Sequence, residues 1–194
     1  MSVPYVIEKG PKDQERVYDL FSRLLKDRII FIKDEFNQQM ADTVAAQLLF
    51  LESADNESDI YMYVNSPGGS ISSMFAIYDV MQYVKPDIAT LGLGTCASAA
   101  SFILAAGTKG KRAALPNTDI MIHELSTGAQ GKYNDIKNQF NHTSKLHDKL
   151  AKYYRDITGK TLTKIKKDME RDYYMSAEEA KDYGLIDKVL YKRG

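Results

Sequence analysis

The chain has 194 residues, 44% of them hydrophobic and 27% charged, so it can bury the core of one globular domain. Its 26 basic and 26 acidic residues balance, which gives no electrostatic basis for binding nucleic acid or an anionic membrane. The single cysteine, Cys96, excludes an internal disulfide and suits a reducing cytoplasm. Residues 1–16 show no apolar run typical of a signal peptide or membrane span, and no Cys/His cluster predicts a structural metal.

Apolar residues at helical spacing alternate with short apolar runs along the first two thirds of the chain. Residues 13–26 are expected to form an amphipathic helix. The continuous run at 29–32 is typical of a strand covered on both faces. The next elements expected are a helix at 40–51, a strand at 60–64, a helix at 71–84 ended by Pro86, a strand at 88–93, a helix at 98–106 capped by Gly107, and strands at 113–115 and 120–123. This order predicts a parallel, helix-covered sheet built from βαβ units.

Residues 133–157 break this alternation, because apolar side chains recur there at helical spacing among many Lys, Asp and Asn residues. A helix of about 25 residues is roughly 37 Å long, whereas a domain of this size has a radius of gyration of about 16 Å. We therefore expect the helix to project from the body and to need another chain over its apolar face. The alternative is a long helix that lies flat on its own domain.

The loop Ser66-Pro67-Gly68-Gly69 follows the strand expected at 60–64 and precedes a helix. Ligands bind at this carboxyl edge of open α/β sheets. Paired glycines let backbone N–H groups approach a ligand that a Cβ would keep away, and such donors can stabilise an oxyanion. The alternative interpretation is a tight turn without a ligand.

Ser98 lies between a strand and a helix, in Gly94-Thr95-Cys96-Ala97-Ser98-Ala99-Ala100-Ser101. A serine there is a candidate nucleophile, because the orphan N–H groups and dipole at a helix N-terminus favour negative charge. From its position alone, an ordinary N-cap serine is the favoured interpretation. Ser101, one turn further on, is interpreted as a small packing residue.

His123 ends the apolar strand 120–123 and is the candidate general base, provided that Ser98 lies at the same sheet edge. The alternative is a structural histidine. His142 and His147 lie on the long charged helix, where solvent or a contact surface is the expected environment. Charged residues are too abundant for composition to choose the group that orients the imidazole.

Five stretches of the chain, taken together, resemble the ClpP family, the proteolytic subunit of the bacterial Clp protease. They are Asn65-Ser66-Pro67-Gly68-Gly69, the Ser98 turn running into 102–112, Met121-Ile122-His123, Glu170-Arg171-Asp172 through Tyr183-Gly184-Leu185-Ile186-Asp187, and Ser22 through Ile30. The resemblance covers essentially the whole chain in order.

The resemblance implies an α/β fold of the ClpP and crotonase type, a ββα superhelix in a single domain over residues 1–194. Residues 1–18, including Tyr5 to Ile7, correspond to the axial loop and N-terminal segment, and about 125–158 to a protruding handle helix that interlocks two stacked heptameric rings. Within that assembly, a tetradecamer, the family encloses a proteolytic chamber.

The resemblance also assigns the site. Ser98 is the implied nucleophile, His123 the general base and Asp172 its orienting partner. The implied oxyanion hole consists of the backbone N–H groups of Gly69 and Ala99.

Substrate binding and ring contacts are implied by the resemblance alone. A strand near 128–131, with Gly128 and Gln130, pairs with an extended substrate peptide by strand addition. Glu170 and Arg171 make contacts between rings.

The expected partners are other copies of the chain, unfolded protein substrates and an AAA+ unfoldase of the ClpX or ClpC/ClpA type. The unfoldase uses the ATP, and this chain, which has no Walker A motif, needs no cofactor. The expected location is the cytoplasm, without nucleic acid or membrane. Tyr61 and Tyr63 belong either to a docking pocket for the unfoldase or to the core.

Three short segments depart from the family pattern. Ala97-Ser98-Ala99-Ala100 replaces Ala-Ser-Met-Gly, His123-Glu124-Leu125 replaces His-Gln-Pro, and Thr127-Gly128 replaces a Gly-Gly pair. These changes predict altered specificity, or a weakly active or regulatory paralogue that needs a second ClpP. Two further alternatives are a crotonase-fold acyl-CoA enzyme and a non-catalytic scaffold subunit.

Overall fold

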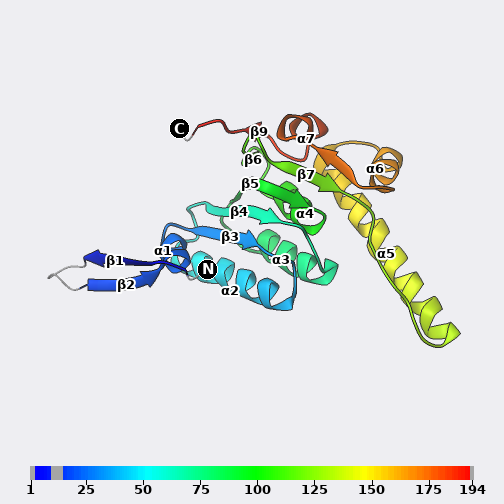
Figure 1. Ribbon diagram of the computed structural model, residues 1–194, viewed down its shortest axis with the longest axis horizontal. Helices are drawn as coiled ribbons and strands as arrows, with labels where there is room; N and C mark the ends of the chain where they lie inside the picture. The colour runs from blue at the N-terminus through cyan, green and yellow to red at the C-terminus, as the bar shows by residue number, and fades with distance from the viewer. Residues whose placement is uncertain (1–2, 10–14, 193–194) are drawn as a thin grey trace.

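The computed structural model describes residues 3–9 and 15–192, with a seven-stranded sheet at the centre (Figure 1). Its strands are β3 (Ile29–Lys33), β4 (Ile60–Ser66), β5 (Ile88–Ala97), β6 (Arg112–Ala114), β7 (Asp119–Ile122), β8 (Tyr173–Met175) and β9 (Lys188–Val189). Strands β3, β4, β5, β6 and β9 pair in that order, all parallel. Strand β7 is parallel to β5 and β8 is antiparallel to β7. The predicted α/β architecture with a mostly parallel sheet is confirmed.

Three helices pack on one face of the sheet: α2 (Gln38–Ala54), α3 (Ile71–Tyr83) and α4 (Ala99–Ala105) (Figure 1). The side chains of β4 on that face are fully buried, whereas Tyr61 on the other face is 44% exposed. The expectation that both faces of the sheet are covered is therefore wrong. On the open face, α1 (Leu20–Lys26) reaches β3 through an edge contact between Phe21 and Phe31. Tyr61 lies outside the core because no described helix covers it.

The first predicted helix, residues 13–26, is wrong at its N-terminal half. Residues 13 and 14 lie outside the described part, and Glu15–Asp19 forms strand β2, antiparallel to β1 (Tyr5–Lys9). The helix begins only at Leu20, where Asp19 accepts a hydrogen bond from the Ser22 backbone N–H at 3.0 Å. The helical spacing of apolar residues suggested that Val17 lies on the buried face of a helix. In the structure Val17 lies opposite Ile7 in this two-stranded ribbon, and both side chains are exposed. Residues 1–18, the expected axial segment, thus form a hairpin where they are described.

Strand β5 is longer than expected and changes partners along its length. Its first part pairs with β6 from Thr90 to Gly92, and its last part pairs with β7 from Thr95 to Ala97. Gly94 lies between the two parts with a φ of 55°, a conformation that glycine adopts without strain. The switch carries the end of β5, and therefore Ser98, to the side of β7.

The last forty residues add elements that the periodicity did not predict: α6 (Leu162–Met169), β8, α7 (Ala177–Tyr183) and β9. They are anchored to the sheet by Asp187, which pairs with Arg112 at 2.7 Å between Oδ1 and Nη2. Burial acts to raise the pKa of Asp187, but the hydrogen bonds from Arg112 outweigh it, so this pKa lies below its ordinary value. Both side chains are mostly buried, so the pair joins β6 to the C-terminal segment in a poorly solvated place.

Helix α5 (Tyr133–Thr158) projects from the body, as the sequence predicts (Figure 1). Its 26 residues span about 39 Å. All residues from 133 to 142 are exposed, including Phe140, whereas Leu150, Ala151 and Tyr154 are buried in the body. Within the described residues, no helix has the length and apolar character needed to cross a membrane.

Candidate active site

Ser98 forms the one-residue turn between β5 and α4, with φ 56° and ψ −120°. Positive φ is uncommon for a residue with a Cβ and costs about 1–3 kcal/mol, which the surroundings must offset. The Ser98 N–H donates to the Met121 carbonyl at 2.8 Å, and its carbonyl accepts from the Phe102 N–H at 3.2 Å. Its hydroxyl makes no capping bond to α4, so the N-cap interpretation is wrong. The hydroxyl is thereby left for a different partner.

The glycine loop after β4 packs directly on this turn. A Cβ on Gly68, which has a φ of 97°, would lie 2.6 Å from the Ser98 Cβ and 2.7 Å from the Ala97 carbonyl oxygen. Only glycine fits there. The loop is held by the Ser66 hydroxyl, which donates to the Asp34 carbonyl and accepts from the Gly68 N–H. The loop is therefore more than a free tight turn, because it supports the Ser98 turn.

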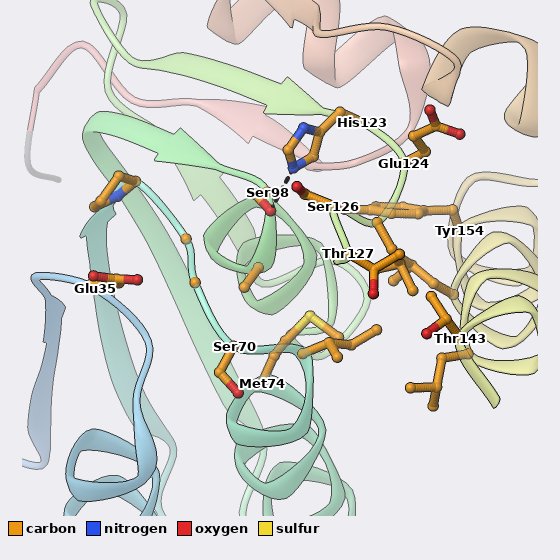
Figure 2. A pocket seen from close by; sticks show the side chains of 18 residues that line it. Glu35, Ser70, Met74, Ser98, His123, Glu124, Ser126, Thr127, Thr143 and Tyr154 are labelled. Atoms are coloured by element: carbon orange, nitrogen blue, oxygen red, sulfur yellow. Dashed lines mark hydrogen bonds between the residues drawn. The ribbon is translucent and has the colours of Figure 1, made fainter. Parts of the chain in front are cut away.

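His123 brings its imidazole to the Ser98 hydroxyl. The Nε2 atom is 2.8 Å from the Ser98 Oγ, and the Nδ1 atom is 3.2 Å from Oδ1 of Asp172 (Figure 2 shows the Ser98–His123 pair). The strands account for this geometry, because His123 follows β7 directly and Asp172 directly precedes β8, and those two strands pair antiparallel. With Nδ1–H donating to the carboxylate, Nε2 is free to accept the Ser98 proton.

The two predicted oxyanion donors lie at the same edge. Gly69 follows the glycine that packs on Ser98, and Ala99 is the first residue of α4. In the part of the chain that the structure describes, neither backbone N–H donates to a protein acceptor. Gly69 also has to be glycine, since a Cβ there would lie 2.6 Å from the carbonyl oxygen of Phe36.

A cavity of about 770 Å³ opens beside the Ser98–His123 pair (Figure 2). Helix α5 lines it with one face, and α3 lines it from the other side. The side chains from these two helices are Ile71, Met74, Thr143, Leu146, Leu150 and Tyr154. Glu35 and Glu124 lie at its border, and both are exposed. The arrangement suits a substrate that places one mainly apolar group beside Ser98.

The segment expected to bind the substrate peptide does not have the expected secondary structure. Residues 123–132 form no strand, so the strand expected near 128–131 is wrong for this chain by itself. Gly128 and Gln130 are exposed; the Gly128 carbonyl accepts a hydrogen bond from the Gln139 side chain at 3.1 Å. A strand needs a neighbour for its backbone groups, and no described strand lies beside this segment.

The remaining predicted residues lie apart from the cavity wall. Glu170 and Arg171 directly precede Asp172 and are exposed, with no ion pair to any described residue. His142 is exposed and His147 is half-buried, both on α5. Cys96 is buried, and burial raises the pKa of its thiol to about 12. Among the residues that the structure describes, no cluster of three His, Cys, Asp or Glu could hold a metal ion.

The family comparison agrees with this fold. A family model described as Clp protease matches residues 12–193. This chain belongs to the Clp protease family. Membership accounts for the mixed α/β architecture with its mostly parallel sheet. It also makes the chain a ClpP-like peptidase by family.

Two residues of the site were missed by reasoning from the sequence. Ser101 was interpreted as a packing residue, but its hydroxyl donates to the Ser98 carbonyl at 2.7 Å. Its oxygen is also 3.1 Å from the Tyr154 hydroxyl, which comes from helix α5. The sequence carries only a weak signal for the first bond, a serine one helical turn after the nucleophile, and none for a partner 53 residues away.

Proposed function

We propose that this chain is a serine endopeptidase subunit in which Ser98, His123 and Asp172 form the catalytic triad. The observation that carries this proposal is the continuous path from the Ser98 hydroxyl through both imidazole nitrogens to the Asp172 carboxylate, beside a cavity. A structural histidine has no need of an uncapped serine hydroxyl on one nitrogen and a carboxylate on the other.

In the proposed reaction, the Ser98 Oγ attacks the carbonyl carbon of the scissile peptide as its proton passes to Nε2 of His123. Asp172 keeps the imidazole oriented and stabilises its protonated form. His123 then gives the proton to the leaving amine, and the acyl group stays on Ser98. Water, deprotonated by His123, releases the acid and restores the serine. The triad is thus used in both half-reactions.

The negative charge on the carbonyl oxygen is proposed to be stabilised by the N–H groups of Gly69 and Ala99. Each such donor contributes about 3–4 kcal/mol to the transition state in serine proteases. Both N–H groups lack an acceptor among the described residues, which supports this role.

The assembly is also proposed rather than observed. The exposed apolar side chains of α5, with Tyr133 77% and Phe140 67% exposed, support a handle helix covered by a second ring. On this proposal the chain forms heptamers and a tetradecamer in the cytoplasm, and an AAA+ unfoldase delivers unfolded proteins at the cost of ATP. Substrate peptides would then pair with the segment containing Gly128 and Gln130, and Glu170 and Arg171 would contact the other ring.

A paralogue that needs a second ClpP is the other candidate. Two observations favour it: the Asp172 side chain is 56% exposed, and the segment after His123 forms no strand by itself. A partner ring that covered both would complete the site. The acyl-CoA alternative loses its support with family membership.

The decisive experiment is intact mass spectrometry of the purified chain after exposure to a fluorophosphonate, with Ser98→Ala as the control. One adduct that is absent from the control, together with cleavage of casein, would support the active peptidase. No adduct in the chain alone but one after mixing with a second ClpP would support the paralogue. No adduct in either condition would contradict the proposed function.

A further inference from the structure

Beneath the Ser98 turn, two hydroxyl groups form a buried chain that the triad does not use. Ser101 on α4 is fully buried, and Tyr154 on α5 is 2% exposed. The Ser101 Oγ is 2.7 Å from the Ser98 carbonyl oxygen and 3.1 Å from the Tyr154 hydroxyl oxygen. The chain therefore runs from the long helix to the backbone of the candidate nucleophile.

The direction of the two hydrogen bonds follows from the groups themselves. A carbonyl oxygen only accepts, so Ser101 must donate its single hydrogen to the Ser98 carbonyl. The Tyr154 hydroxyl must then donate to the Ser101 oxygen. Burial raises the pKa of Tyr154 well above its usual range, so the hydroxyl keeps its hydrogen across the working pH range.

The Ser98 carbonyl and the Ala99 N–H belong to one planar peptide unit. A hydrogen bond that holds the carbonyl end also sets the direction in which the N–H end points. Accepting that bond polarises the peptide unit and makes its N–H a stronger donor, which is the cooperative effect of linked hydrogen bonds. The unit needs such support, because Ser98 has a positive φ.

We propose that Ser101 and Tyr154 are positioning residues for the oxyanion hole, in which Tyr154 donates to Ser101, Ser101 donates to the Ser98 carbonyl, and the Ala99 N–H is thereby aimed at the oxyanion. This inference rests on the proposed function, since it assigns the oxyanion-hole role to Ala99. It adds to that function two residues that touch neither the triad hydrogen bonds nor the scissile bond.

Packing by itself does not account for the Tyr154 hydroxyl. The ring already makes an edge contact with Phe102, with 5.6 Å between ring centroids, and a phenylalanine would make the same contact. A buried hydroxyl without a partner is unfavourable, and the Tyr154 hydroxyl has its partner in Ser101.

The first test is Tyr154→Phe, which removes the donor and keeps the ring. We expect kcat for a fluorogenic peptide, and the rate of fluorophosphonate labelling of Ser98, to fall about 3–10-fold, the effect of one lost hydrogen bond. KM and the pH profile of labelling should stay unchanged, because the Tyr154 ring that lines the cavity is kept and His123 is not altered. Tyr153→Phe is the matched control: Tyr153 packs on Phe102 too, has no described hydrogen-bond partner and does not line the cavity.

The second test is Ser101→Ala, alone and combined with Tyr154→Phe. Ser101→Ala breaks the bond to the Ser98 carbonyl directly, so its kcat should fall at least as far as that of Tyr154→Phe. Because the two residues act in series, the double variant should show the same kcat as Ser101→Ala. Its melting temperature should be higher than that of Ser101→Ala, since no buried hydroxyl is left without a partner.

The outcomes separate this inference from the proposed function. Normal kcat in Tyr154→Phe, in a preparation whose wild type is active, would overturn the positioning role and leave the peptidase standing. Losses that multiply in the double variant, or that follow the melting temperature, would also overturn it, because they indicate a structural role. Failure of both the wild type and Tyr153→Phe to react at Ser98, alone or with a second ClpP, would contradict the proposed function and this inference with it.

Discussion

The two sides of the cavity beside Ser98 differ in how completely one chain builds them. On the closed side, Ser98 donates a hydrogen bond to the Met121 carbonyl and accepts hydrogen bonds from Phe102 and Ser101, and Gly68 packs on the turn without space for a methyl group. On the open side, residues 126–142 are exposed and residues 123–132 form no strand. The difference indicates that the Ser98 turn is fixed by contacts within one chain, whereas residues 126–142 have few such contacts.

The physical reason lies in the kinds of contact on each side. The closed side is part of the hydrophobic core, because α4 is buried along its whole length and packs against the sheet. The open side begins where the chain leaves the core, and its backbone groups have few partners there. On the proposed function, a side whose backbone stays free can pair with varied peptides.

The largest expected effect is at Asp172, whose exposed carboxylate joins the closed side through His123. Asp172→Ala should lower kcat by a factor of about 10³–10⁴, because the imidazole loses its orientation and the charge that stabilises its protonated form. Peptide hydrolysis measures the effect. Asp182→Ala, an exposed aspartate on α7, is the control and should keep full activity. Unchanged turnover in Asp172→Ala would remove this residue from the mechanism.

The next effect concerns the sheet that supports the closed side. Arg112→Met leaves the mostly buried Asp187 carboxylate without its partner, and we expect a loss of about 3–5 kcal/mol in the free energy of unfolding, measured in urea. Lys85→Met, which breaks an exposed pair with Glu57, should cost less than about 1 kcal/mol. Equal losses in the two variants would show that burial of the Arg112–Asp187 pair does not increase its contribution to the free energy of unfolding.

The same pair predicts a pH dependence. Because the pKa of Asp187 is lowered in the folded chain, its contribution to stability is present above the ordinary aspartate pKa of about 3.9 and is lost as the pH falls through the folded value. The acid limb of the unfolding free energy should therefore be shallower in Asp187→Asn than in the wild type. Identical acid limbs would contradict this assignment.

A smaller effect on turnover is expected at Gly68. Gly68→Ala places a methyl group 2.6 Å from the Ser98 Cβ, so the turn must shift, and a displacement of about 1 Å lowers turnover roughly 10²-fold. Gly110→Ala is the matched control, because Gly110 also has a positive φ, but a methyl group added there would meet no described atom within 4 Å. It should lose stability and keep its kcat. If kcat fell in both variants, backbone strain at a positive φ would explain the loss without a shift of the Ser98 turn.

The smallest effect on the chain itself is expected on the open side. Phe140→Ser should change the free energy of unfolding of the single chain by less than about 0.5 kcal/mol, since Phe140 is 67% exposed. In sedimentation velocity the same variant should lose the tetradecamer, whereas Lys137→Ser on the same helix should keep it. A tetradecamer that survives Phe140→Ser would contradict the proposed cover of α5 by a second ring.

Local patterns in the sequence predicted most elements of the first two thirds of the chain. The strands β3, β4 and β7 and the helices α2, α3 and α5 lie close to their expected positions, because the spacing of apolar residues within each segment matches the element that it forms. The N-terminal ribbon was missed because neither face of it is buried where Val17 pairs with Ile7. The sequence there has no alternation of apolar and polar residues that would indicate a strand. The short elements after α5 were missed because they depend on contacts such as Arg112 with Asp187.

The residues of the candidate site also divide into those that local sequence patterns could select and one that they could not. Ser98, His123 and the paired glycines could be selected from the sequence, because each stands at the end of an apolar run where parallel strands deliver their residues to one edge. Asp172 was reached only through the family resemblance. In the structure it lies beside His123 because β8 runs antiparallel to β7, a pairing that no local pattern records.

By itself, then, the sequence determined the α/β class, the sheet edge that carries the reactive residues, the projecting helix and the family. Only the tertiary structure decided that Ser98 leaves its helix uncapped, that β5 changes partners to bring Ser98 beside His123, and that Tyr154 reaches Ser101 from 53 residues away. The reason is physical. Periodicity records which face of a segment is buried, whereas hydrogen bonds between distant segments depend on how those segments pack together.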